Sequence, residues 1–213
     1  MTSRTSTRRA ALAAVAVTAA LVLTACGGSG DVDGRAAHGP SASPSTSAGT
    51  AHNAQDVTFA QGMIPHHQQA LEMARLAAGR ASSAQVKDLA TRIEKAQDPE
   101  IRTMTGWLKS WGEQVPMAGM HHSGHSGMSG MTGMPGMPGM MSDGDMSELK
   151  KAKGTDFDTK FLSLMVEHHQ GAVEMAGTEQ NKGTYGPAKT MADAIVTAQN
   201  AEIKEMKKLL GKR

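Results

Sequence analysis

Cysteine is nearly absent from this chain, which has one, Cys26. A single thiol cannot close a disulfide within one chain, and it leaves no thiolate for a metal site in the folded part. Aromatic residues make up only 3% of the sequence, which argues against an aromatic-rich β-sandwich. An excess of one charge is also lacking: residues 1–25 hold three of the 22 Lys and Arg, so their removal leaves 19 against 20 Asp and Glu. This near-neutral balance gives no indication of a nucleic-acid partner.

A long apolar run is absent except near the N-terminus, where residues 10–25 follow three arginines. A basic start and an apolar stretch too short for a comfortable membrane span predict a secretory signal peptide over residues 1–25. Residues 23–26, Leu-Thr-Ala-Cys, resemble a bacterial lipobox, which implies cleavage before Cys26 and lipid attachment to its sulfur. We therefore expect a lipid anchor that holds the protein at the extracytoplasmic face of a bacterial cell membrane.

Residues 26–53 are rich in Gly, Ser, Ala, Thr and Pro and show no apolar periodicity. Such a composition cannot bury enough apolar surface to fold, so it predicts a flexible tether. The folded domain is expected to occupy residues 54–213.

What the chain does contain is an internal repeat. Residues 59–74 recur 102 positions later, with nine identities in sixteen positions and no gap, and the same offset continues downstream. The repeat units therefore cover residues 56–111 and 158–213, and residues 112–155 form an insert between them. A duplication of this kind determines the architecture, because each copy can pack against the other.

The apolar residues of both repeats follow the period of a helix, which turns by about 100° per residue. In the first copy, Phe59, Met63, Ala70 and Met73 fall on the same stripe as His66, and the second copy repeats this pattern. Neither hairpin of helices could bury its stripe alone. The sequence therefore predicts an all-α, ferritin-like four-helix bundle with pseudo-twofold symmetry, built from a duplicated helical hairpin.

The expected helices are bounded by capping and stop signals. They run from near Asp56 to Gly79, from Ser83 to Trp111, from Asp156 or Asp158 to near Gly177, and from Pro187 to Leu210. Pro65 lies inside the first helix and cannot donate to the Gln61 carbonyl, so we expect either a kink there or a helix that properly begins near Ile64.

Two adjacent histidine pairs hold the same place in the two repeats, each with a methionine three residues before the first histidine and another seven residues after it. The candidate metal ligands are Met63, His66, His67, Met73, Met165, His168, His169 and Met175. A buried imidazole must be hydrogen-bonded or metal-bound, because an unsatisfied buried polar group costs about 1–3 kcal/mol. Four imidazoles and four thioethers that converge by symmetry favour a soft metal.

The alternative is a set of core histidines that bond to polar side chains of the second helices, namely Gln97, Glu100, Gln199 and Glu202. If a metal binds instead, these four residues are candidates to orient the ligand imidazoles from behind. Glu72 and Glu174 are expected either to form salt bridges or to take the same orienting role.

The insert holds a second group of soft ligands. Candidate loop ligands are Met117, Met120, His121, His122, His125, Met128, Met131, Met134, Met137, Met140 and Met141. Five of these methionines recur every three residues among Gly, Ser, Thr and Pro, a composition that cannot hold a helix or build a core. We expect a disordered central loop whose thioethers and imidazoles bind Cu(I) or Ag(I), although a drifted low-complexity linker is the bland alternative.

Residues 63–74 read Met-Ile-Pro-His-His-Gln-Gln-Ala-Leu-Glu-Met-Ala, and residues 165–176 read Met-Val-Glu-His-His-Gln-Gly-Ala-Val-Glu-Met-Ala. This doubled motif resembles the bacterial DUF305 family of secreted proteins over about residues 54–111 and 155–211. The resemblance implies a ferritin-like four-helix fold, and some members are periplasmic copper-binding proteins that contribute to copper resistance. It points to the eight repeat ligands named above and implies no enzymatic activity.

Three functions follow from these patterns. The first is a lipid-anchored protein that binds copper, as Cu(I), to sequester it, hand it to a partner protein or confer resistance. The second is a ferritin-like di-metal oxidase, which is disfavoured because the Glu-x-x-His element of such sites does not occur in the sequence. The third is a structural or interaction module whose polar core only enforces register.

Overall fold

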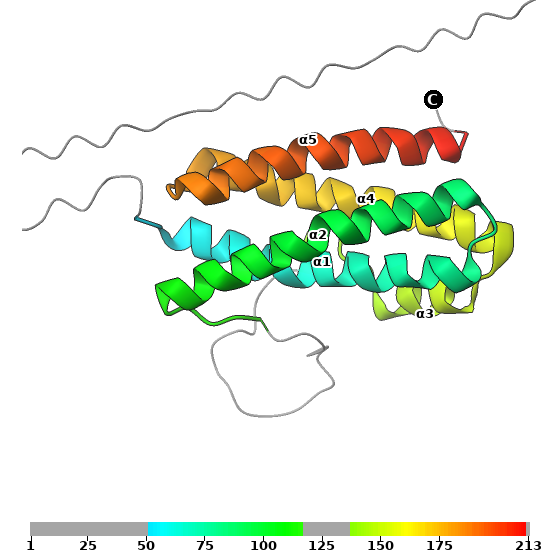
Figure 1. Ribbon diagram of the computed structural model, residues 1–213, viewed down its shortest axis with the longest axis horizontal. Helices are drawn as coiled ribbons and strands as arrows, with labels where there is room; N and C mark the ends of the chain where they lie inside the picture. Colours follow the sequence, from blue (N-terminus) through cyan, green and yellow to red (C-terminus); the bar gives the residue numbers. More distant parts are fainter. Residues whose placement is uncertain (1–50, 117–136, 212–213) are drawn as a thin grey trace, which may run out of the picture. The chain divides into compact units, whose positions relative to one another are not determined.

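The computed structural model describes residues 51–116 and 137–211. These residues form five helices, α1 (Ala54–Arg80), α2 (Ala84–Trp111), α3 (Asp143–Lys151), α4 (Gly154–Lys182) and α5 (Gly186–Leu209), and within them there is no strand (Figure 1). The α1–α2 and α4–α5 hairpins are the two sequence repeats. The predicted all-α bundle of a duplicated hairpin is confirmed.

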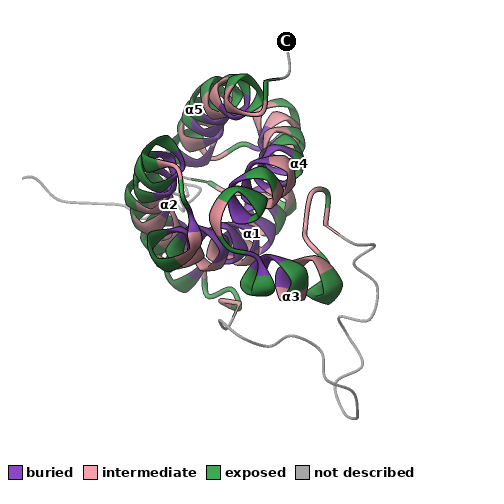
Figure 2. Ribbon diagram, turned by 90° about the vertical axis from the view of Figure 1, so that its right-hand side faces the viewer, coloured by how far each residue is buried: buried purple, intermediate pink, exposed green. Residues whose placement is uncertain are grey.

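The central contact of the bundle is between α1 and α4, which come from different repeats. Helix α2 packs on α1 and α5 packs on α4, so each repeat remains a hairpin. Figure 2 shows the buried faces of these four helices turned towards one another. Helix α3 lies outside this set, against α1 and α4. The α1–α4 contact is therefore where residues of the two histidine motifs can meet.

The first helix of each repeat begins earlier than the sequence analysis predicted. Asn53, not Asp56, is the N-cap of α1, and the two form a capping box in which the Asp56 carboxylate accepts from the Asn53 backbone N–H. Helix α4 begins at Gly154 after Lys153, which makes no side-chain cap, so neither Asp156 nor Asp158 is a cap. Both predictions were wrong because Asp56 and Asp158 bind backbone N–H groups of turns in the opposite repeat, while Asp156 is exposed.

The predicted stop at Gly177 is also wrong, since α4 continues to Lys182. A glycine inside a helix costs only about 1 kcal/mol relative to alanine, which the packing of the flanking buried residues overrides. Each of the other predicted helix ends lies within one residue of the observed end, and Ser83 is the N-cap of α2.

Helix α1 runs without interruption through Pro65, so the prediction of a helix that begins near Ile64 is wrong. Proline removes one backbone hydrogen bond from a helix interior. Here both neighbours, Ile64 and His66, are buried, and their packing holds the helical path across the defect.

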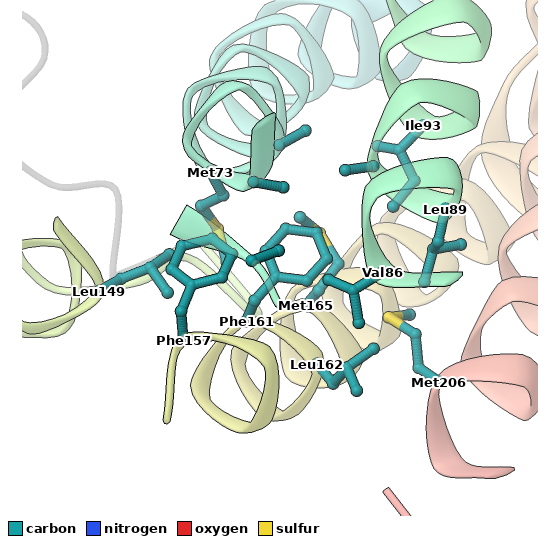
Figure 3. Close-up of a cluster of buried hydrophobic side chains, with 14 of the residues drawn as sticks. Met73, Val86, Leu89, Ile93, Leu149, Phe157, Phe161, Leu162, Met165 and Met206 are labelled. Atoms are coloured by element: carbon teal, nitrogen blue, oxygen red, sulfur yellow. The ribbon is translucent and has the colours of Figure 1, made fainter. Parts of the chain in front are cut away.

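The core consists of two apolar clusters, each with residues from both repeats. The Phe157 cluster, shown in Figure 3, includes Met73 of α1 and Met165 of α4. The Phe59 cluster includes Met63 of α1 and Ala172 and Ala176 of α4. Along α1, the first cluster begins at residue 70 and the second ends at residue 64. The histidine motifs occupy the layer between the two clusters.

Helix α3 lies in the insert after the Met-rich run, and the sequence analysis did not predict it. Ser142 caps it in a capping box with Asp145, and its Met146 and Leu149 are buried in the Phe157 cluster. A nine-residue helix would be marginal in isolation, so its order comes from this packing. The sequence signal was present in the capping box but was masked by the Gly/Met-rich run before it.

Several predictions concern residues outside the described ranges. These are the signal peptide, Cys26, the tether up to residue 50, and the loop candidates Met117, Met120, His121, His122, His125, Met128, Met131 and Met134. Among the helices of the described ranges, none is both long and apolar enough to cross a membrane.

Candidate metal centre

The four histidines of the repeat motif lie fully buried at the α1–α4 contact. His66, His67, His168 and His169 are each 0% exposed. His66 of one repeat faces His168 of the other, with ring centroids 3.8 Å apart and ring planes tilted by 40°. The duplication thus brings the first histidine of each motif into direct contact, as the predicted convergence requires.

Three of these imidazoles have an oxygen acceptor behind them. Nε2 of His67 lies 2.8 Å from Oε2 of Glu100, and Nε2 of His169 lies 2.8 Å from Oε2 of Glu202. Nε2 of His66 lies 3.1 Å from the carbonyl oxygen of Pro138. Carboxylate and carbonyl oxygens only accept, so Nε2 carries the proton in each case. In the neutral ring this leaves Nδ1 with a free lone pair.

Those lone pairs have nothing to bind among the described residues. Nδ1 of His66, His67, His168 and His169 has no hydrogen-bond partner, and His168 lacks a partner on Nε2 as well. Buried polar side-chain atoms are nearly always hydrogen-bonded, so unpartnered ones require an explanation. An imidazole held by an oxygen at one nitrogen and free at the other is the usual arrangement of a metal ligand.

Burial keeps the facing pair neutral. Loss of hydration lowers the pKa of His66 to about 3, with a further contribution from the neighbouring His67. The pKa of His168 is also lowered well below its ordinary value by burial and by the nearby His66. Neutral imidazole is the form that binds metal ions, so these two rings need not lose a proton to do so.

The methionines of the motif lie in the clusters on either side of the histidine layer. Met63 and Met175 belong to the Phe59 cluster, and Met73 and Met165 to the Phe157 cluster. Met175 is only partly buried, whereas the other three are 0% exposed. The antiparallel α1–α4 contact therefore pairs the methionine before one histidine motif with the methionine after the other.

Within residues 51–116 and 137–211, no three side chains drawn from His, Cys, Asp and Glu are grouped so that they could hold a metal ion. The donor atoms available at the histidine layer are imidazole nitrogens, with thioethers in the clusters on either side. That donor set suits Cu(I) and other soft cations rather than Mg²⁺ or Ca²⁺, which require oxygen ligands.

The six expected supporting residues divide into three groups. Glu100 and Glu202 bind the second histidine of each motif, as described above. Gln97 and Gln199 are buried, and their side-chain oxygens have no partner among the described residues. Glu72 forms a 2.6 Å ion pair with Lys150 of α3, and Glu174 is exposed on α4, so neither contacts a histidine.

Sequence reasoning missed the segment that supplies the Pro138 carbonyl. We name residues 137–142, which lead from the insert into α3, the return segment. The side-chain amide of Gln69 donates from Nε2 to the Met141 carbonyl oxygen at 3.0 Å, and its Oε1 accepts from the Met141 backbone N–H at 2.8 Å. A Cβ added at Gly171 would overlap the Pro138 carbonyl oxygen, so the absent side chain is what permits this approach. Gln69 and Gly171 hold equivalent positions in the repeats, and this difference between the motifs was the available signal.

The family is now decided by comparison with known proteins. The family described as "Domain of unknown function (DUF305)" matches residues 56–210. The chain belongs to the DUF305 family. The predicted membership is thereby confirmed. A comparison of the sequence with curated proteins finds no match.

Solved structures of DUF305 proteins resemble this chain along most of their length. A putative secreted DUF305 protein from Streptomyces coelicolor is 33% identical, with a TM-score of 0.63, 74% of this chain and 92% of that chain covered. A DUF305 fragment from Deinococcus radiodurans is 30% identical, with a TM-score of 0.62 and coverage of 75% and 97%. CopM in its Cu(II)-bound form is 33% identical, with a TM-score of 0.60 and coverage of 73% and 95%. CopM is also solved in Cu(I)-bound and Ag-bound forms.

Proposed function

We propose that this DUF305 protein binds copper as Cu(I), with Ag(I) as a chemical substitute, at the histidine layer between α1 and α4. The observation that carries the proposal is His168, a fully buried imidazole with no hydrogen-bond partner on either nitrogen among the described residues. It faces His66, whose Nδ1 is equally free. A soft cation supplies what these nitrogens lack, and the copper- and silver-bound forms of CopM support the choice of metal.

The residues that would hold the cation are the facing imidazoles of His66 and His168, with His67 and His169 beside them. Their neighbours Glu100, Glu202 and the Pro138 carbonyl fix three of the rings with Nδ1 free. Thioether ligands come from Met63, Met73 and Met165, the three motif methionines that are fully buried. Because copper is the cargo, this site need only retain and release it, without any reaction of the protein.

The wider role that we propose is copper sequestration, transfer or resistance outside the cytoplasm. A signal peptide and a lipid anchor on Cys26 would hold the domain at the outer face of the cell membrane. There, thioether and imidazole are the soft ligands that an oxidising compartment leaves available. A partner protein that receives or delivers copper belongs to the same proposal.

Competition with a coloured Cu(I) chelator tests the metal site. The variant His168→Leu removes the unpartnered imidazole and fills its place with an apolar side chain. The matched control is His52→Ala, because His52 lies outside the layer and stacks on Trp111 at a centroid distance of 4.3 Å. We expect wild type and control to withhold Cu(I) from the chelator and His168→Leu to release it. Equal retention of Cu(I) by all three proteins would show that the histidine layer does not bind the metal.

A melting experiment separates metal binding from a purely structural polar core. A ligand that binds only the folded state must raise Tm, whereas a structural module is indifferent to it. We expect Ag(I) to raise Tm of wild type but not of His168→Leu.

We propose a binding protein rather than an enzyme. Glu100 and Glu202, the carboxylates nearest the histidine layer, are each engaged by an imidazole. A di-iron oxidase needs several inward carboxylates in addition. We therefore expect no catalysed oxygen consumption with ferrous iron, and sustained consumption would restore the oxidase hypothesis.

A further inference from the structure

Two methionine side chains from distant parts of the chain meet at Gly62 of α1. A Cβ placed at Gly62 would lie 3.1 Å from Cε of Met175 on α4 and 3.7 Å from Sδ of Met137 on the return segment. Gly62 is buried, while Met137 and Met175 are both half-buried. The two thioethers thus lie between solvent and the core, over a helix position that has no side chain to separate them.

The position of Met137 is fixed by the residues that follow it. The carbonyl of Pro138 accepts from His66, and the backbone of Met141 is held at both polar groups by Gln69. Gly171 leaves the space that the segment occupies against α4. Three independent contacts therefore hold Met137 at Gly62, which a loosely attached loop would not achieve.

The pair connects the insert to the histidine layer. On one side, Met137 belongs to the run of methionines spaced by three residues from Met128 to Met140. On the other side, Met137 is bonded to Pro138, which contacts His66, and Met175 packs on the Phe59 cluster that contains Met63. Met137 is thus joined along the chain to the Met-rich insert on one side and to the residue that contacts His66 on the other.

We propose that Met137 and Met175 form a two-thioether site for a soft monovalent cation, from which the cation passes to the histidine layer. The passage to the histidines rests on the proposed function, whereas cation binding by the two sulfurs does not. Transfer is an exchange of ligands, one sulfur leaving as one nitrogen binds, with no change in the charge of the cation. Thioethers select Cu(I) and Ag(I) over hard cations such as Mg²⁺.

Methionine is also a common filler of irregular core gaps, so the experiment must distinguish packing from binding. Leucine conserves the volume of methionine at a cost typically under about 1.5 kcal/mol, but it has no sulfur. The test variants are therefore Met137→Leu and Met175→Leu in the full chain. The matched control is Met191→Leu, since Met191 is also half-buried and also packs on the Phe59 cluster.

Titration with Ag(I), observed by NMR of isotope-labelled methionine methyl groups, reads both sulfurs directly. In wild type and in Met191→Leu, we expect the methyl signals of Met137 and Met175 to shift together. In Met137→Leu, we expect the Met175 shift to be lost while the protein keeps the wild-type fold. A Met175 signal that is unmoved in wild type, or that shifts equally without Met137, overturns the two-thioether site.

Imidazole signals recorded in the same titration separate this inference from the proposed function. If the His66 and His168 rings respond to Ag(I) while the two methyl groups do not, the thioether site fails and the histidine site stands. If the methyl groups respond and the rings do not, the histidine site and the transfer step fail together. We expect both the rings and the methyl groups to respond in wild type, and the rings to respond more slowly in Met137→Leu.

Discussion

Asp56 on α1 and Asp158 on α4 hold the same position in the two repeats, and each binds the turn of the opposite repeat. Asp158 accepts backbone N–H groups of residues 82–83, in the turn between α1 and α2. Asp56 accepts those of residues 184–185, in the turn between α4 and α5. Each repeat is thus hydrogen-bonded to a turn of the other, and these contacts help to set the relative placement of α1 and α4.

Replacement of Asp158 by asparagine should destabilise the bundle. The amide keeps the shape but loses the negative charge and one acceptor, and hydrogen bonds to charged groups contribute about 1.5–3 kcal/mol each. We expect the free energy of unfolding in urea to fall by about that amount. The control Asp156→Asn changes an exposed residue two positions earlier and should have little effect. Equal stability of the two variants would show that the reciprocal contacts do not hold the repeats together.

A buried carboxyl beside Asp56 makes stability depend on pH. Burial, and the neighbouring Asp56, raise the pKa of Glu179 from 4.5 to about 8. The folded state therefore keeps a proton that the unfolded chain releases near its ordinary pKa. The stability gained in this way is complete below pH 4.5 and is lost as pH rises towards 8. The slope is at most about 1.4 kcal/mol per pH unit for one proton.

Urea denaturation at a series of pH values measures this slope. Glu179→Gln mimics the protonated carboxyl, so it should flatten the pH dependence and stabilise the protein most at the alkaline end. Glu174→Gln, an exposed glutamate on the same helix, should leave the slope unchanged. An undiminished slope in Glu179→Gln would assign the pH dependence to another group.

Replacement of two glycines of α4 by alanine should change the stability of the protein in opposite directions. At Gly171 an added Cβ would overlap the Pro138 carbonyl, so the return segment must detach and His66 loses its acceptor. We expect a loss of about 1–3 kcal/mol, the usual cost of overpacking. At Gly177 nothing lies within 4 Å of an added Cβ, so alanine should stabilise the helix by about 0.5–1 kcal/mol. Thermal unfolding of the two variants checks both signs, and a stabilised Gly171→Ala protein would contradict the docked segment.

Glu202 should tune copper affinity without binding copper. Its carboxylate accepts from Nε2 of His169 and so holds Nδ1 free and correctly oriented. Loss of such a supporting group typically costs 10–100-fold in metal affinity, and we expect Glu202→Gln to weaken Cu(I) binding by about that factor. Chelator competition measures the affinity, with Glu174→Gln as control. Unchanged affinity would mean that His169 needs no such support or is not a ligand.

Much of the fold could be predicted because the repeat fixed it. The offset of 102 residues places His66 and His168 in equivalent positions, and two amphipathic hairpins have few ways to bury their stripes. The four main helices and the convergence of the two motifs follow from that. The starts of α1 and α4 were predicted less well, because the carboxylate of Asp56 accepts both from Asn53 and from the α4–α5 turn, and only the tertiary structure shows the second partner.

The features that were missed break the symmetry of the repeat. Helix α3 and the return segment belong to the insert between the repeats, so the duplication gave no indication of them. Gln69 and Gly171 differ between otherwise similar motifs because only one side of the bundle receives the return segment. Such a difference between repeats can be seen in a sequence. The group that packs against Gly171, the Pro138 carbonyl, cannot be identified in the same way.

The most direct test is a crystal structure of residues 27–213, loaded with Ag(I) and examined for anomalous scattering. Residues 27–213 omit only the predicted signal peptide and Cys26. We predict a silver peak at the α1–α4 contact, within bonding distance of a nitrogen of His66 or His168. Silver found only at surface sites, with both imidazoles unchanged, would contradict the central claim that the duplicated histidines form a metal centre.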